Sequence, residues 1–406
     1  MTDDVGGEVD VGPGVTSIPA QPLDETTVSR LPGPRPRVLH VVQPTVDGVA
    51  RHVAQLVGVQ VGLGWPVTVA SPPGGDLRRQ VTGTGASWTP WPAGREPGLN
   101  MVAEFLRLRS LVGRVRPDVV HLHASKASTV GRLLLRGRLP TIVQPQAWSF
   151  RAVDGRMRQV VTAWERLAAR WSHSIICASQ LEFDLAVEAG IDGPLVVVQN
   201  SIDLTEFAPP EAGSQHRARA DLGLSPGPLV VCVGRLCRQK GQDVLLDAWP
   251  LVTSRVPSAR LVLVGDGPDQ DSIAARASDD VILAGRQANY ADWLIAADVV
   301  ALPSRWEGQS LTLLASMACG RSVVASDVEG MQDALATGTP EAAGALVAPE
   351  DRTALADALV TRLLDPALAM QEGEHGRTRA VRDYGLSRWA ETMSSITLEV
   401  LSATPG

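Results

Sequence analysis

Short apolar runs recur along the chain from residue 37, and each is followed by a longer segment with apolar residues every three or four positions. The short runs have the length of buried strands, whereas the longer segments are typical of amphipathic helices. This alternation predicts a parallel, doubly wound α/β sheet. In the first half, the expected strands are residues 37–43, 66–71, 118–123, 140–144, 173–178 and 194–198.

The pattern breaks over residues 206–228, which are rich in proline and glycine and are interpreted as a linker. A second alternating series then begins, and its expected strands are residues 229–233, 259–264, 281–284, 298–302 and 322–325. Two Rossmann-like domains facing across a cleft are therefore expected. Such domains bind ligands at the carboxyl ends of their strands.

The full length of 406 residues, 44% of them hydrophobic, is enough for two cores. We expect five segments. They are a disordered leader (1–35), a first Rossmann-like domain (36–205), the linker (206–228), a second Rossmann-like domain (229–385) and a C-terminal helix that crosses back to the first domain (386–406).

The formal net charge of −7 is unevenly distributed. Residues 36–200 hold 18 Lys and Arg against 11 Asp and Glu, so the first domain is basic although the whole chain is acidic. A basic domain favours an anionic partner, such as a phosphorylated acceptor or an anionic lipid surface. Nucleic acid is not expected as a partner, because no recognition module is present and aromatic residues make up only 4% of the chain.

The four cysteines lack the spacing of a zinc site or a redox pair, so we expect reduced thiols in a cytoplasmic protein. No apolar run is long enough to cross a membrane.

The most informative chemistry follows the strand at 229–233. Gly234 and Arg235 come directly after it, and Lys240 precedes the next amphipathic segment. Lys240 is one of only two lysines in the chain, the other being Lys126. A forked guanidinium and a compact ammonium at one strand end can bind a diphosphate between them. The alternative is a pair of solvated cations.

Several later motifs occur in a fixed order. They are Gly265-Asp266-Gly267-Pro268, then Gly285-Arg286, then Pro303-Ser304-Arg305-Trp306-Glu307-Gly308, and finally Met317-Ala318-Cys319-Gly320. In the first half, Asp47-Gly48 follows the first strand, and His121-Leu122-His123 leads to Ser125-Lys126. Over about residues 36–400, this series closely resembles family 4 of the retaining, nucleotide-sugar-dependent glycosyltransferases (glycosyl transferases group 1), which have the GT-B fold.

The resemblance implies roles for particular residues. Arg235 and Lys240 would neutralise the donor diphosphate as it leaves, without a divalent metal or other cofactor, and Glu307 would bind hydroxyls of the donor sugar. The nucleotide diphosphate sugar would be a co-substrate. The first domain would lie on the acceptor side, and the acceptor would be a polysaccharide precursor, a glycolipid or a small molecule. The further donor-binding candidates are Gly48, Gly234, Gly285, Arg286, Gly308, Gln309, Ser310, Leu311 and Ala315. The candidates for contact with the acceptor or a sugar are His123, Ser125, Lys126 and Gln146.

The chain departs from the family pattern at several places. Ala315 replaces a second glutamate that would accept hydrogen bonds from the ribose, and Gln146 replaces a histidine in the turn after the fifth strand. Glu329 places a negative charge in a loop that usually has two glycines, close to the expected diphosphate. An alternative function is therefore a catalytically impaired paralogue that acts as a binding or stabilising subunit. A sugar-nucleotide epimerase of the same fold fits the motifs less well.

Two weaker signals stay open. Residues 102–116 are amphipathic with arginines on the polar positions, which fits either peripheral docking at the inner membrane face or an ordinary solvated helix. His121 and His123 alternate along one strand and share a face, but the sequence offers no third ligand beside them, so no metal site is predicted.

Overall fold

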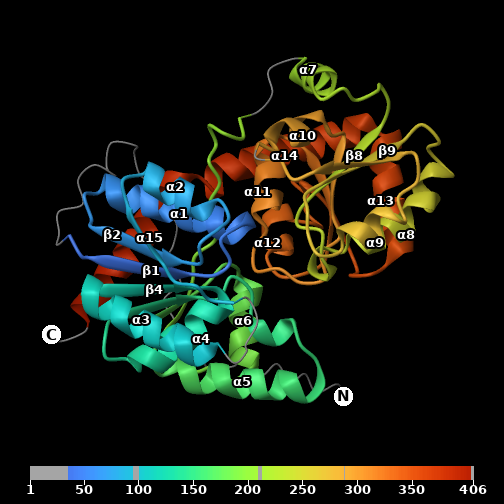
Figure 1. The fold of residues 1–406 in the computed structure, drawn as a ribbon. Helices are drawn as coiled ribbons and strands as arrows, with labels where there is room; N and C mark the ends of the chain where they lie inside the picture. The colour runs from blue at the N-terminus through green and yellow to red at the C-terminus, as the bar shows by residue number, and fades with distance from the viewer. Residues whose placement is uncertain (1–34, 95–99, 209–212, 288, 404–406) are drawn as a thin grey trace, which may run out of the picture.

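A computed structural model describes residues 35–94, 100–208, 213–287 and 289–403. Within these residues, two parallel sheets, each layered with helices, lie side by side (Figure 1). The expected leader falls outside the described residues except for Arg35. The fold is the two-sheet α/β architecture that the hydrophobic pattern predicts.

The first sheet has seven strands in the order β3-β2-β1-β4-β5-β6-β7, all paired in parallel. Every residue of its two central strands is buried, as expected for strands covered by helices on both faces. The strands are β1 (Val38–Val42), β2 (Val67–Ser71), β3 (Ser87–Pro90), β4 (Val119–His123), β5 (Thr141–Gln144), β6 (Ser174–Cys177) and β7 (Leu195–Val197).

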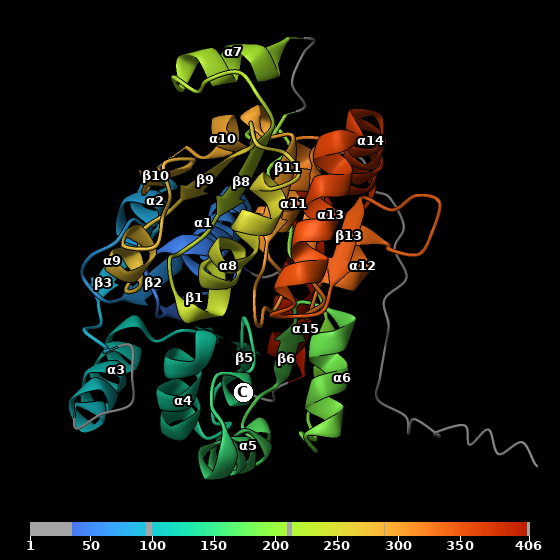
Figure 2. The same ribbon diagram turned by 90° about the vertical axis from the view of Figure 1, so that its right-hand side faces the viewer.

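Helices connect these strands in the right order for a doubly wound sheet. They are α1 (Asp47–Gly62), α2 (Leu77–Gly83), α3 (Met101–Val115), α4 (Ala124–Leu135), α5 (Gly155–Ala169) and α6 (Gln180–Glu188). Helices α3, α4 and α5 lie along the lower edge of this domain in both views (Figures 1 and 2).

The second sheet has six parallel strands in the order β10-β9-β8-β11-β12-β13. Its strands are β8 (Leu229–Val233), β9 (Arg260–Val264), β10 (Val281–Gly285), β11 (Val299–Leu302), β12 (Ser322–Ser326) and β13 (Gly344–Val347). Its helices are α8 (Gln242–Thr253), α9 (Gln270–Ala274), α10 (Ala291–Ala296), α11 (Leu311–Ala318), α12 (Met331–Leu335), α13 (Arg352–Leu364) and α14 (Pro366–Asp383).

The strand order reverses direction once in each sheet. In the first sheet, the reversal lies between β1 and β4, and in the second it lies between β8 and β11. Loops at the carboxyl ends of such neighbouring strands diverge, and the crevice between them is where doubly wound sheets bind ligands. The reversal points therefore indicate where to look for chemistry.

The last helix, α15 (Leu386–Ser402), leaves the second domain and packs against the first. Its apolar face, which includes Trp389, Met393 and Ile396, shares a core cluster with Leu56 of α1 and Val119 of β4. In Figure 1 this helix is red and lies among the blue elements. This C-terminal helix therefore ties the two domains together.

Three elements were not predicted. Strands β3 and β13 are short edge strands of four residues each, and β3 has no fully buried position. Both strands are too short to give a periodic signal. Helix α7 (Ser214–Asp221) lies within the expected linker and has a single buried residue, Ala218, so its sequence carries almost no hydrophobic face. No helix in the described part of the chain is long and apolar enough to cross a membrane.

Candidate active site

The reversal point of the second sheet brings Lys240 and Glu307 together. Lys240 follows β8 in a short 3₁₀ helix (Arg238–Lys240), and Glu307 follows β11. Although they are 67 residues apart, the Lys240 ammonium donates to Oε1 of Glu307, which also accepts from Ser304 Oγ at 2.8 Å. The Glu307 side chain is 7% exposed and that of Lys240 is 22% exposed. This pair is the charged centre of the candidate site.

Arg235 is half-buried at the end of β8. No carboxylate of the described residues pairs with its guanidinium. The backbone around it is fixed, since its carbonyl accepts from Gln242 Nε2 at 3.1 Å and Gly234 N donates to Val264 O at 2.9 Å. A half-buried arginine without a counter-charge is suited to receive an anion from outside the protein.

The turn after Lys240 requires glycine. Gly241 has φ of +67°, and a Cβ on it would lie 2.0 Å from the carbonyl oxygen of Pro303. The backbone of the loop after β8 therefore lies directly on the loop after β11. This close approach holds Lys240 within reach of Glu307.

The first domain supplies the opposite wall. A Cβ on Gly48, at the start of α1, would lie 3.8 Å from Leu311 Cδ1 at the start of α11. A Cβ on Gly308 would lie 2.9 Å from the carbonyl oxygen of Gln146. Gln146 has φ of +64°, so its turn presents backbone to the other domain. These contacts place the loops of both domains around Glu307.

Gln309 links the two domains by hydrogen bonds to Asn200. Its Oε1 accepts from Asn200 N at 2.5 Å, and its carbonyl accepts from Asn200 Nδ2 at 2.9 Å. Several buried polar atoms nearby have no partner within the described residues, namely Gln146 Nε2, Asn200 Oδ1 and Gln309 Nε2. Buried polar groups are nearly always hydrogen-bonded, so this concentration of unpaired ones indicates a place for a polar ligand.

Helix α11 begins beside this centre. Ser310 is its N-cap and accepts from Leu313 N at 3.4 Å, and the helix's remaining free N–H groups lie in its first turn. Free N–H groups at the start of a helix favour the binding of a phosphate group. One turn further on, Ala315 is fully buried in the core and offers no polar group.

Gly285 is the last residue of β10, and Arg286 follows it at the carboxyl end of the second sheet. Gly285 has φ of +66°, and its carbonyl accepts from Gly265 N at 2.8 Å. The Arg286 guanidinium pairs with Asp76 of the first domain at 2.7 Å. Arg286 therefore contributes a second polar link between the domains.

The residues predicted to contact an acceptor lie at different depths. Ser125 is half-buried at the start of α4, whereas His123 is fully buried and the Lys126 side chain is 4% exposed. The Lys126 ammonium pairs with the buried carboxylate of Glu104 at 3.0 Å. Direct contact with a sugar would require His123 and Lys126 to become accessible, so of the four candidates Gln146 and Ser125 are the better placed.

Glu329 has a partner that the sequence did not reveal. Its carboxylate is 3% exposed and lies 2.5 Å from Nε of Arg151, which belongs to the first domain. The negative charge that was expected to disfavour a diphosphate is thus balanced by a cation from the opposite domain. No local pattern could have identified Arg151, because the two residues are 178 positions apart in sequence.

Removal of Arg151 tests this interdomain ion pair. Arg151→Ala leaves the Glu329 carboxylate buried without a cation, and we expect the free energy of unfolding to fall by roughly 1–3 kcal/mol, since Arg151 is one-third exposed. Chemical denaturation measures the change. Arg382→Ala, which breaks an exposed pair with Asp383, should change stability by less than about 0.5 kcal/mol. A double variant with Glu329→Gly should recover the loss, and failure to recover would contradict the pairing.

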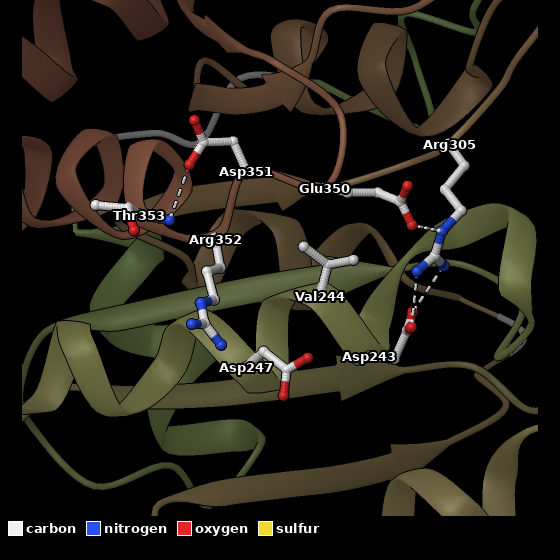
Figure 3. A pocket seen from close by; sticks show the side chains of 8 residues that line it. All are labelled: Asp243, Val244, Asp247, Arg305, Glu350, Asp351, Arg352 and Thr353. Carbon is white, nitrogen blue, oxygen red and sulfur yellow. Dashed lines mark hydrogen bonds and ion pairs between the residues drawn. The ribbon is translucent and has the colours of Figure 1, made fainter.

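A separate pocket of about 480 Å³ lies on the second domain and is lined by several carboxylates (Figure 3). Arg305 crosses it, pairing with Asp243 at 2.8 Å and with Glu350 at 2.6 Å. Since Arg305 is two residues before Glu307, these pairs fix the loop that carries Glu307. The acidic lining makes this pocket a poor site for a diphosphate.

Comparison with known families gives two matches, one for each domain. Residues 46–206 match the model described as Glycosyltransferase Family 4, and residues 227–365 match the model described as Glycosyl transferases group 1. The two matches cover both sides of the candidate site.

Two curated relatives and one solved structure extend these matches. The chain is 29% identical to the lipopolysaccharide core biosynthesis mannosyltransferase LpcC of Rhizobium leguminosarum bv. viciae, over 74% of this chain and 85% of the relative. It is 31% identical to the alpha-maltose-1-phosphate synthase of Mycolicibacterium smegmatis, over 67% of this chain and 76% of that relative. In fold it matches the crystal structure of Anabaena Alr3699/HepE in complex with UDP and glucose, with a TM-score of 0.77 and 19% sequence identity. The match covers 90% of this chain and 99% of the Anabaena chain.

Proposed function

Because this chain belongs to glycosyltransferase family 4 and has its GT-B fold, we propose that Arg235, Lys240 and Glu307 are the centre of its transfer reaction. The enzyme is a retaining hexosyltransferase that moves a sugar from a nucleotide diphosphate sugar to a polysaccharide precursor, a glycolipid or a small-molecule acceptor. The observation that carries the assignment is the Lys240–Glu307 pair beside the half-buried, uncompensated Arg235.

The two cations act on the leaving group. As the bond from the anomeric carbon to the diphosphate oxygen breaks, its electron pair stays on the diphosphate, and the added charge lies between Arg235 and Lys240. Charges that are already in place stabilise such a transition state without reorganising solvent. The N–H groups at the start of α11 add partial positive charge on the same side.

Glu307 positions the sugar rather than the phosphates. Its carboxylate is held by Lys240 and Ser304, and its remaining lone pairs can accept hydrogen bonds from sugar hydroxyls. The unpaired amide of Gln146 can donate to the same sugar from the opposite domain. The acceptor oxygen then forms its bond to the anomeric carbon on the face that the diphosphate leaves, and its proton passes to the departing diphosphate oxygen.

We infer the other contacts with the donor from where the remaining candidate residues lie around the site. Gly48 faces Leu311 across the domain boundary, so its loop can approach the diphosphate without a side chain intervening. Gly285 and Arg286 would hold the base through their backbone. Ala315 provides no carboxylate for the ribose, and loss of one such charged hydrogen bond weakens donor binding by roughly 1.5–3 kcal/mol.

A donor panel tests the assignment. Binding and slow hydrolysis are measured for UDP-, GDP-, ADP- and dTDP-sugars with the parent protein. We expect one nucleotide to bind and to be hydrolysed slowly, because water can replace the acceptor. If none of the donors bound, the proposal would be contradicted, and the alternative of an impaired paralogue serving as a binding or stabilising subunit would be favoured.

The basic first domain supports an anionic or lipid-linked acceptor presented at a membrane surface. Helix α3 exposes Val102 by 70% and Leu106 by 55%, and α5 exposes Met157 by 57% and Val160 by 63%. Exposed arginines accompany these apolar residues, namely Arg107, Arg109 and Arg114 on α3, Arg116 directly after it, and Arg156 and Arg158 on α5. Apolar residues beside basic ones on surface helices are typical of peripheral binding to anionic lipid.

Sedimentation with vesicles tests this contact. We expect the protein to bind vesicles that contain phosphatidylglycerol and not vesicles of phosphatidylcholine alone. Replacing both Arg107 and Arg109 with alanine should weaken binding by about 2 kcal/mol, or roughly 30-fold. Val102→Ser should also weaken it. Met370→Ser is the matched control, because Met370 is 64% exposed on the second domain and should leave binding unchanged. Equal binding to both kinds of vesicle would contradict an anionic docking surface.

A further inference from the structure

The reversal point of the first sheet gathers three histidines. His40 lies on β1 and His121 lies opposite it on β4, while His123 follows two residues later on the same face. All three side chains are at most 1% exposed. One nitrogen from each lies within 4.8 Å of the others, so the third ligand that the sequence did not reveal comes from the neighbouring strand.

Hydrogen bonds define the state of His40. Its Nε2 lies 2.7 Å from the amide oxygen of Gln60, which can only accept, so Nε2 carries the proton and Nδ1 carries a lone pair. That Nδ1 lies 2.9 Å from Nε2 of His123. Gln60 on α1 thus orients the ring and keeps a lone pair on its inner nitrogen, as partners outside the ligand set do in metal sites. A metal ion would replace the present hydrogen bond between this nitrogen and His123 Nε2.

Three nitrogens of the other two imidazoles are left unpaired. Neither nitrogen of His121 has a hydrogen-bond partner within the described residues, and neither has Nδ1 of His123. Buried polar nitrogens without a partner are costly. A metal ion that accepts one lone pair from each ring would reduce this cost.

We propose that His40, His121 and His123 form a binding site for a transition-metal ion of the kind imidazole prefers, with Zn²⁺ as the ion to test. Tetrahedral Zn²⁺ with nitrogen ligands at about 2.0–2.1 Å holds those nitrogens roughly 3.3 Å apart. The three histidine nitrogens lie within 4.8 Å of one another, so they would have to move closer together to hold the ion. The fourth position is left for water, which can deprotonate on the ion and reduce its buried charge.

The proposed ion would stabilise the structure and would take no part in the transfer reaction. It would join β1 and β4 from their middle residues to the end of β4, and these strands lead to the loop of Gly48 and to Ser125. The cations that face the diphosphate are in the other sheet, so transfer itself needs no metal. A metal here would fix the first-domain wall of the site.

Metal content of the full chain, purified without a histidine tag from zinc-supplemented medium, tests the proposal. After dialysis against a chelator, we expect about one Zn²⁺ per chain by elemental analysis. Protein produced with Co²⁺ should show the visible absorption of a tetrahedral site. His121→Asn should lose the ion, whereas His216→Asn, which alters an exposed histidine on α7, should retain it. Gln60→Leu should lower Zn²⁺ affinity by roughly 10- to 100-fold.

The parent protein alone can overturn the inference. If it held no Zn²⁺ after dialysis and gave no Co²⁺ absorption, the cluster would be a network of neutral histidines. An unchanged metal content in both His121→Asn and Gln60→Leu would likewise place the ion elsewhere. Should His121→Asn fail to fold, the Gln60→Leu affinity and the Co²⁺ spectrum of the parent still decide the question.

Discussion

Replacing Lys240 with methionine is expected to lower kcat/KM for sugar transfer by about 100- to 1,000-fold. Methionine keeps most of the length of the side chain but removes the ammonium, so the diphosphate loses one of its two cations as it leaves. Arg235→Ala should cause a loss of similar size. Steady-state kinetics with the donor identified by the panel measure both effects, and a melting curve for each variant shows whether the fold is intact.

Arg238→Ala is the matched control for this prediction. Arg238 lies in the same 3₁₀ helix as Lys240, but it is exposed and its guanidinium lies 5.6 Å from the ring centroid of Trp306. Its removal should change kcat/KM by less than about threefold, because a solvated charge interacts weakly at a distance. If Lys240→Met and Arg238→Ala had the same effect, the loop would be supplying only general positive charge and the proposed clamp would be wrong.

Glu307→Gln should lower kcat/KM by roughly 10- to 100-fold, which is the effect of losing a hydrogen bond to a charged acceptor. The amide preserves the size of the side chain but removes the charge that holds Lys240 and accepts from sugar hydroxyls. The loss should be present for donor hydrolysis as well as for transfer, because Glu307 is expected to bind the donor rather than the acceptor. Single-turnover hydrolysis of the donor separates these possibilities.

Glu350→Gln provides the comparison for Glu307. Glu350 is also a carboxylate paired with a cation of the second domain, but its side chain is 61% exposed in the acidic pocket beside Arg305 (Figure 3). Arg305 keeps its pair with Asp243 in this variant, so the loop that carries Glu307 should stay in place. Full activity of Glu307→Gln would remove this residue from the reaction and leave the two cations as the only catalytic groups.

The departures from the family pattern differ in their consequences. Glu329 is neutralised by Arg151, and Gln146 keeps an unpaired amide next to Gly308, so neither change removes a function from the site. Ala315 is different, because no described side chain places a carboxylate at its buried position. Weak donor binding is therefore the expected consequence of this sequence, whereas loss of the reaction is not.

The sequence alone was sufficient for the repeated strand–helix pattern and for the motifs at strand ends. Buried strands and amphipathic helices have local periods, so runs such as 229–233 were identified without knowing their neighbours. Arg235, Lys240 and Glu307 could be predicted as site residues because each follows a strong strand signal in a motif of fixed spacing. The edge strands β3 and β13 and helix α7 were missed because few of their residues are fully buried, and burial is what creates the periodic signal.

Only the tertiary structure decided which distant residues meet. The pairing of β1 with β4 places His40 opposite His121 across 81 residues of sequence, and the packing of the domains places Arg151 beside Glu329. It also showed that His123 and Lys126 are buried. These partners depend on strand order, register and domain orientation, which arise from packing of the whole chain and leave no trace in the local spacing of hydrophobic and polar residues.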